Sequence, residues 1–175
     1  QQCAMIRPHD ARMWASLGVC YDRLGRNAQA IECFKRHLTC PLTHLESVEA
    51  IARIIELYEQ GGDSVHATMY HCLLVQVVDR SMAQMDPALM SRFAFSYIIA
   101  ARWEMGELKG RLYYSKEDKR LGRAAQASMP TGDIVKAHDY LQKVLLAGTE
   151  MTPVAEELLI KLGGRKERGY DDNTT

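Results

Sequence analysis

Four side chains of the types that bind zinc follow one another at helical spacing in this sequence. Cys33, His37, Cys40 and His44 stand at i, i+4, i+7 and i+11, and thiolate and imidazole groups are ligands that zinc favours. Cys33 and His37 could chelate an ion from one helix. Pro41 should end that helix, however, and side chains on one helical face cannot surround a tetrahedral ion. We therefore expect no metal and no cofactor, and interpret these thiols as buried packing groups.

The remaining chain offers no arrangement of catalytic groups. It contains no Ser/His/Asp arrangement, no glycine-rich phosphate loop and no paired-carboxylate motif. The other histidines in helix-like segments, His66, His71 and His138, have no such partners in the sequence. The sequence thus predicts a protein that is not an enzyme.

Composition points towards proteins as partners. The chain has 175 residues, 47% of them hydrophobic, and 22 basic residues balance 22 acidic ones. A neutral chain has no overall attraction for nucleic acid or for an anionic membrane. No apolar run of about 20 residues and no signal-peptide pattern occurs, and the five cysteines are odd in number. We expect a soluble intracellular protein with free thiols.

Gly18 lies in the middle of a helix-like segment and belongs to a repeat motif. Glycine inside a helix costs roughly 1 kcal/mol relative to alanine, so we expect a specific packing role for Gly18. It belongs to a set of six residues that match W-x2-L-G-x2-Y-x8-A-x3-F, namely Trp14, Leu17, Gly18, Tyr21, Ala30 and Phe34. This is the signature of the tetratricopeptide repeat (TPR), which pairs two antiparallel helices. We expect Gly18 to face Ala30 where the two helices approach closely, with the aromatic side chains beside them.

A shift of 34 residues reproduces the same classes of residue. The second repeat has Val48, Ile51, Ala52 and Ile55 at the Trp, Leu, Gly and Tyr positions, and Ala67 in the helix of residues 65–78. The first helix of a third repeat is predicted at 90–105, with Phe95, Ser96 and Ile99 at the Leu, small and Tyr positions. The second helix of that repeat is predicted at 134–148, with Ala137 as its small residue.

The predicted fold class is all-α, with TPR helix-turn-helix repeats stacked as a right-handed α-solenoid and a C-terminal capping helix. Residues 1–8 would end a preceding repeat of a longer array. The predicted segments that follow are a repeat at 9–42, a degenerate repeat at 43–80, a repeat at 86–148 interrupted by an insertion at 109–132, a capping helix at 152–163 and a flexible tail at 164–175.

The first helices of such repeats line a concave groove that can hold a peptide. Counting from the packing residues predicts exposed positions at 12, 15, 19 and 22, at 46, 49, 53 and 56, and at 90, 93, 97 and 100. The candidate partner-binding residues among them are Arg12, Asp22, Glu46, Glu49, Arg53, Glu56 and Tyr97. The middle set is acidic with one arginine and would suit a basic peptide side chain. Ordinary solvated surface charges are the alternative.

The first repeat also resembles a narrower family. The run "RPHDARMWASLGVCYDRLG" is similar to the C-terminal TPR region of the subunit 8 family of the anaphase-promoting complex (cyclosome), which is also called the cell division cycle protein twenty-three family. The resemblance implies a noncatalytic scaffold of a multisubunit ubiquitin ligase that acts in mitosis, cell division and the cell cycle. It also implies other TPR subunits and a coactivator segment as partners, and a location in nucleus and cytoplasm.

Two other kinds of partner remain open at this point. Cochaperone TPR modules grip the C-terminal carboxylate of heat-shock proteins with Lys and Asn on their first helices. Here the corresponding wall offers Ala15, Val19, Glu49 and Arg53, which suits a carboxylate poorly. The insertion at 109–132 has a surplus of basic residues and two tyrosines and could touch RNA or an acidic surface. Because the chain as a whole is neutral, we expect a solvated loop and no nucleic-acid partner.

Overall fold

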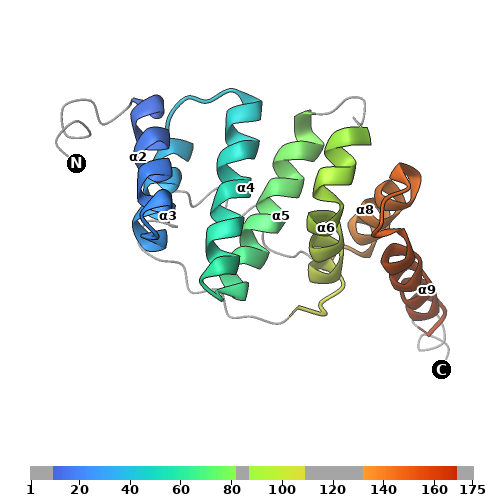
Figure 1. The fold of residues 1–175 in the computed structure, drawn as a ribbon. Coiled ribbons are helices and arrows are strands. Elements are labelled where there is room, and N and C mark those ends of the chain that lie inside the picture. The colour runs from blue at the N-terminus through green and yellow to red at the C-terminus, as the bar shows by residue number, and fades with distance from the viewer. Residues whose placement is uncertain (1–9, 82–86, 109–131, 169–175) are drawn as a thin grey trace. The chain divides into compact units, whose positions relative to one another are not determined.

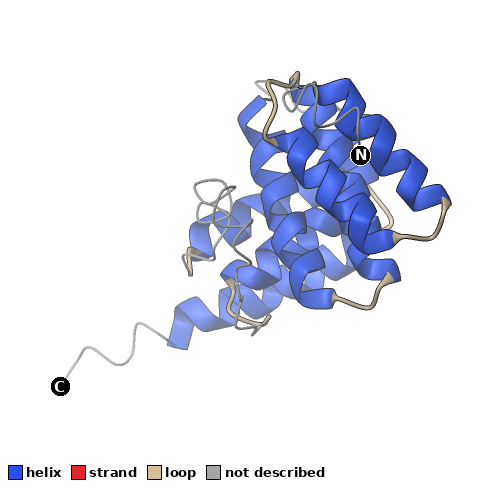
Figure 2. Ribbon diagram, turned by 90° about the vertical axis from the view of Figure 1, so that its left-hand side faces the viewer, coloured by secondary structure: helices blue, strands red, loops and turns tan. Residues whose placement is uncertain are grey.

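The computed structural model describes residues 10–81, 87–108 and 132–168, and these ranges contain seven α-helices and no strand (Figure 2). The predicted all-α class is confirmed. The preceding-repeat segment 1–8 and nearly all of the predicted insertion lie outside the described residues. The helices belong to two compact units, which divide after Ser81.

The first unit consists of four helices that follow one another closely in the chain (Figure 1). Three of them start at side-chain caps: the Asp10 carboxylate accepts the backbone N–H of Arg12 at 3.1 Å, Thr43 forms a capping box with Glu46, and the Asp63 carboxylate accepts the backbone N–H of His66 at 3.1 Å. Such caps satisfy the N–H groups that a helix start leaves without partners. The helices are α2 (Ala11–Arg23), α3 (Asn27–Leu38), α4 (His44–Gln60) and α5 (Ser64–Ser81).

The core of the first helix pair explains Gly18. A Cβ atom added there would lie 2.8 Å from Cζ of Phe34, and the next two closest atoms belong to the same ring. Phe34 is buried, and Ala30 is completely inaccessible. Gly18 is therefore a packing residue as predicted, but the group pressing on it is the Phe34 ring and not the small Ala30 side chain. Leu17 and Tyr21 pack against the buried cluster of Trp14, Cys33 and Cys40.

The second unit contains α6 (Pro87–Glu104), α8 (Ile134–Ala147) and α9 (Thr152–Arg168). The rings of Tyr97 on α6 and Tyr140 on α8 meet edge to face, with centroids 5.7 Å apart. The buried Glu104 carboxylate accepts the backbone N–H of Asp133 at 3.1 Å. This bond fixes the start of α8 against the end of α6, and Ala137 is fully buried as the sequence predicts.

The capping helix is longer than the sequence indicates. The prediction that it ends at residue 163 and that a tail begins at 164 is wrong, because α9 continues to Arg168. Gly163 and Gly164 are of the residue type that commonly ends a helix, yet neither has a positive φ. A Cβ on either glycine would meet no atom within 4 Å. Both glycines simply lie within the helix.

Three of the helices end in the same turn. The backbone N–H three residues after the last helical residue donates to the carbonyl five residues before it. The glycine just before this donor has a left-handed conformation, which only glycine adopts without cost. These bonds are Arg26 to Tyr21 at 2.9 Å, Asp63 to Tyr58 at 2.9 Å and Glu107 to Arg102 at 3.0 Å. The glycines are Gly25, Gly62 and Gly106, with φ of 67°, 73° and 71°.

Candidate protein-interaction surface

An arginine ties together the predicted groove residues of the first unit. The Arg53 guanidinium of α4 donates to the Asp22 carboxylate of α2 and also to Glu56 one turn further along α4. The Asp22 side chain is only 13% exposed, against 41% for Arg53 and 50% for Glu56. The hydrogen bond that the guanidinium donates to Asp22 raises the pKa of Arg53 above its ordinary value. Residues predicted from separate repeats therefore do come together, but Arg53 is already engaged by two carboxylates.

The remaining groove candidates of this unit differ in role. Glu46 accepts the Thr43 backbone N–H at 2.8 Å and so caps α4. Its hydrogen bonds to Thr43 lower the pKa of the Glu46 carboxyl. Arg12 and Glu49 are exposed on α2 and α4. Together with Asp22, Arg53 and Glu56, these three residues make a set of four carboxylates and two guanidinium groups. Ala52, predicted as a packing residue, is half-buried.

In the second unit, the positions predicted to line the groove are wrong. Tyr97 is 1% exposed and packs on Tyr140, so it cannot line a groove. The neighbouring positions Met90, Phe93 and Ala100 are buried as well, whereas Phe95, which was assigned to the core, is 49% exposed.

The exposed side of α6 consists of residues that the sequence analysis missed. Between Met90 and Glu104 only five residues are not buried, and apart from Ser91 they are Arg92, Phe95, Ile99 and Arg102. Their spacing, i, i+3, i+7 and i+10, equals that of positions 12, 15, 19 and 22 on α2. The exposed positions of α6 thus lie two residues after the predicted ones. Arg92 and Arg102 could have identified this exposed side from the sequence, because charged side chains are almost never fully buried unless paired.

Three members of the cysteine and histidine series, Cys33, His37 and Cys40, are buried, whereas His44 is exposed at the start of α4. Cys33 and Cys40 are buried around Trp14, and burial raises the pKa of both thiols, which disfavours the thiolate that a metal needs. His37 places Nδ1 2.8 Å from the Ala11 carbonyl oxygen. Within the described ranges, no three His, Cys, Asp or Glu side chains are grouped so that they could hold a metal ion.

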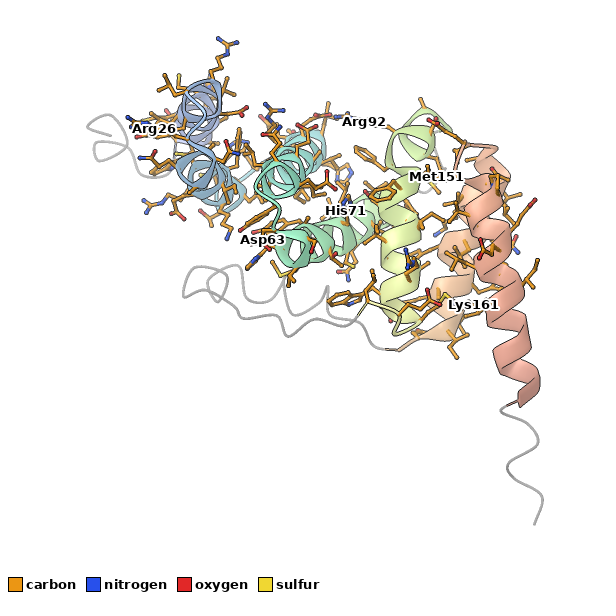
Figure 3. All side chains as sticks on the ribbon, turned by 60° about the horizontal axis from the view of Figure 1, so that its bottom comes forward. Arg26, Asp63, His71, Arg92, Met151 and Lys161 are labelled. Carbon is orange, nitrogen blue, oxygen red and sulfur yellow. The ribbon has the colours of Figure 1, made fainter. Side chains whose placement is uncertain are left out.

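A titratable pair joins α4 to α5 in the first unit. Nε2 of His71 lies 3.0 Å from the Glu59 carboxylate, and the imidazole is buried. Figure 3 shows His71 on α5. Burial lowers the pKa of His71 even though Glu59 acts in the opposite direction. The neutral imidazole is therefore the form that the fold prefers.

This preference predicts a loss of stability in mild acid. Below the ordinary histidine pKa of about 6.5 the unfolded chain takes up a proton that the folded chain binds less well, so stability falls as pH decreases, by at most about 1.4 kcal/mol per pH unit for one proton. We expect His71→Gln to lose less stability than the parent between pH 7.5 and pH 5.5 in urea unfolding. An equal loss in both proteins would contradict the assignment.

The structure and the comparisons give two further findings. None of the helices in the described part of the chain is long and apolar enough to cross a membrane. Comparisons with protein-family models, with curated proteins and with solved structures found no match.

Proposed function

We propose that the chain is a noncatalytic protein-interaction module built from TPR helix pairs stacked as a right-handed α-solenoid. The observation that carries this proposal is the repeated unit: α2, α4 and α6 end in the same turn with a left-handed glycine. Each of them packs on the next described helix, α3, α5 or α8.

Within this class we propose a scaffold role in the anaphase-promoting complex. The support is the resemblance of "RPHDARMWASLGVCYDRLG" to the subunit 8 family, and the acidic wall formed by Glu46, Glu49 and Glu56 on α4. The partners would be other TPR subunits and a coactivator segment, in nucleus and cytoplasm during the cell cycle. The wall binds its partner through side-chain contacts and changes no covalent bond, so no residue has a catalytic role.

The test is affinity capture of the tagged chain from dividing cells, followed by identification of the captured proteins. We expect TPR subunits and a cullin-like ligase core, and a reduced yield of coactivator with Glu49→Lys, which reverses a charge on the α4 wall. Glu150→Lys makes the same change at an exposed position between α8 and α9 and is the matched control. Capture of chaperones alone, with micromolar binding of a Glu-Glu-Val-Asp peptide in calorimetry, would contradict the proposal and favour a cochaperone module.

A further inference from the structure

Arg53 lies within the acidic wall of α4 that we propose as a partner-binding surface. Its guanidinium uses two different nitrogens, because Nη2 donates to the Asp22 carboxylate of α2 and Nη1 donates to the Glu56 carboxylate of α4. The two carboxylates converge on one cation although α2 and α4 belong to different helix pairs of the first unit. A side chain of the protein itself therefore fills the position that a basic group of a partner would take.

The burial of these three side chains indicates which of them can move away. Asp22 is mostly buried, whereas the side chains of Arg53 and Glu56 are substantially exposed. The charge of Arg53 also lies at the end of a long flexible stem. An ion pair with an exposed partner contributes little net free energy, because water solvates the separated charge well. Arg53 can thus turn into the solvent at small cost, provided that another cation takes its place beside Asp22.

The charges of the cluster define the cation that can replace Arg53. If Arg53 left alone, the mostly buried Asp22 carboxylate would lose its cation, and an unpaired buried charge is costly. A guanidinium from a partner would restore the pairing. Its planar fork offers several N–H donors and can serve two carboxylates at once, whereas an ammonium group is a point charge. The pair of Asp22 and Glu56 therefore fits an arginine better than a lysine.

We propose that Arg53 is an internal competitor, which occupies the pair of Asp22 and Glu56 until an arginine of a bound peptide takes its place. This inference rests on the proposed function, since it names how one wall of the proposed module is regulated. A site that is open for only part of the time binds its ligand with an affinity reduced by the open fraction. Arg53 thereby discriminates against peptides whose own cation does not fit both carboxylates.

The experiment is an NMR titration of the isotope-labelled whole chain with the peptide Ala-Ala-Arg-Ala-Ala. In the parent chain we expect weak saturable binding that shifts the side-chain Nε–H resonance of Arg53. Arg53→Gln removes the competitor and should tighten binding by about threefold or more. A purely structural role of Arg53 predicts the opposite, because a loosened wall binds less well. Arg26→Gln removes the same charge from an exposed position in the turn between α2 and α3 (Figure 3) and should leave the affinity unchanged.

Two further variants connect this effect to the proposed contacts. Asp22→Asn combined with Arg53→Gln should lose the gain, because the carboxylate that receives the arginine of the peptide is gone. Arg53→Lys keeps the positive charge but lacks the planar fork, so it should give a smaller gain than Arg53→Gln. Arg53→Lys also provides the test if Arg53→Gln does not fold. The backbone resonances of each variant verify that the helices are intact.

Three results would overturn the inference. These are absence of peptide binding up to about 20 mM, a gain in Arg53→Gln no larger than that in Arg26→Gln, and a gain that persists with Asp22→Asn. Equally tight binding of Ala-Ala-Lys-Ala-Ala to Arg53→Gln would also overturn it, since the guanidinium fork would then have no role. Capture of the ligase subunits without a gain in Arg53→Gln would reject only this inference. A gain that depends on Asp22, with no ligase subunit captured, would reject only the scaffold role.

Discussion

Tyr97→Ala is expected to lower the free energy of unfolding of the second unit by about 3–5 kcal/mol, the usual cost of removing a buried aromatic ring. Tyr97 is 1% exposed and meets Tyr140 edge to face, so truncation removes both the buried area and the ring contact. Phe95→Ala, two residues away on the same helix, should cost distinctly less, because that side chain is 49% exposed and less apolar area is lost.

The two tryptophans allow this comparison to be made unit by unit. Trp14 lies in the first unit and Trp103, on α6, lies in the second, so a Trp14→Phe background leaves fluorescence that reports on α6 alone. Urea unfolding in this background gives the stability of each variant. If Phe95→Ala proves the costlier change, Phe95 belongs to the core, as first predicted from the sequence, and the buried side of α6 is assigned wrongly.

The reason that the sequence misplaced this register lies in the composition of α6. "AFSYIIAARW" is apolar on nearly every side, and a helix buried on most of its surface has little periodicity to assign a face. In contrast, α3 (Asn27–Leu38) has clearly separated polar and apolar residues, so its buried side follows from the sequence. For α6 the burial of Tyr97 against Tyr140 and of Glu104 against Asp133 decides the orientation. Both contacts join residues that lie on opposite sides of the predicted insertion in the chain, so no nearby sequence pattern indicates them.

The candidate site was predictable to the extent that it follows from helical spacing. The positions of Asp22, Arg53 and Glu56 on the first helices follow from the 34-residue comparison, but their mutual ion pairing depends on how α2 and α4 lie side by side. His37 is a similar case, since its partner is the carbonyl of Ala11 on another helix. Spacing identified which side chains share a face, and tertiary contacts determine which of them remain available to a partner.

Gly18→Leu is the second change with a large expected effect. A Cβ at this position would lie 2.8 Å from the buried Phe34 ring, so a leucine must displace the ring and should destabilise the first unit by about 1–3 kcal/mol or more. Gly163→Leu is the matched control. That glycine is also helical but exposed, with open space at its Cβ position, so the better helix propensity of leucine should leave stability unchanged or raise it by up to about 0.8 kcal/mol.

A double-mutant cycle then tests whether Phe34 is the group that requires glycine. With Phe34 present, Gly18→Ala should destabilise, because the added methyl group meets the ring. With Phe34→Leu in the background, the ring is gone and the same change should stabilise through helix propensity. Trp14 fluorescence in a Trp103→Phe background follows the first unit, and Nε1 of Trp103 has no hydrogen-bond partner among the described residues that this replacement would remove. If Gly18→Ala changes the free energy of unfolding with the same sign in both backgrounds, a constraint other than the Phe34 ring requires the glycine.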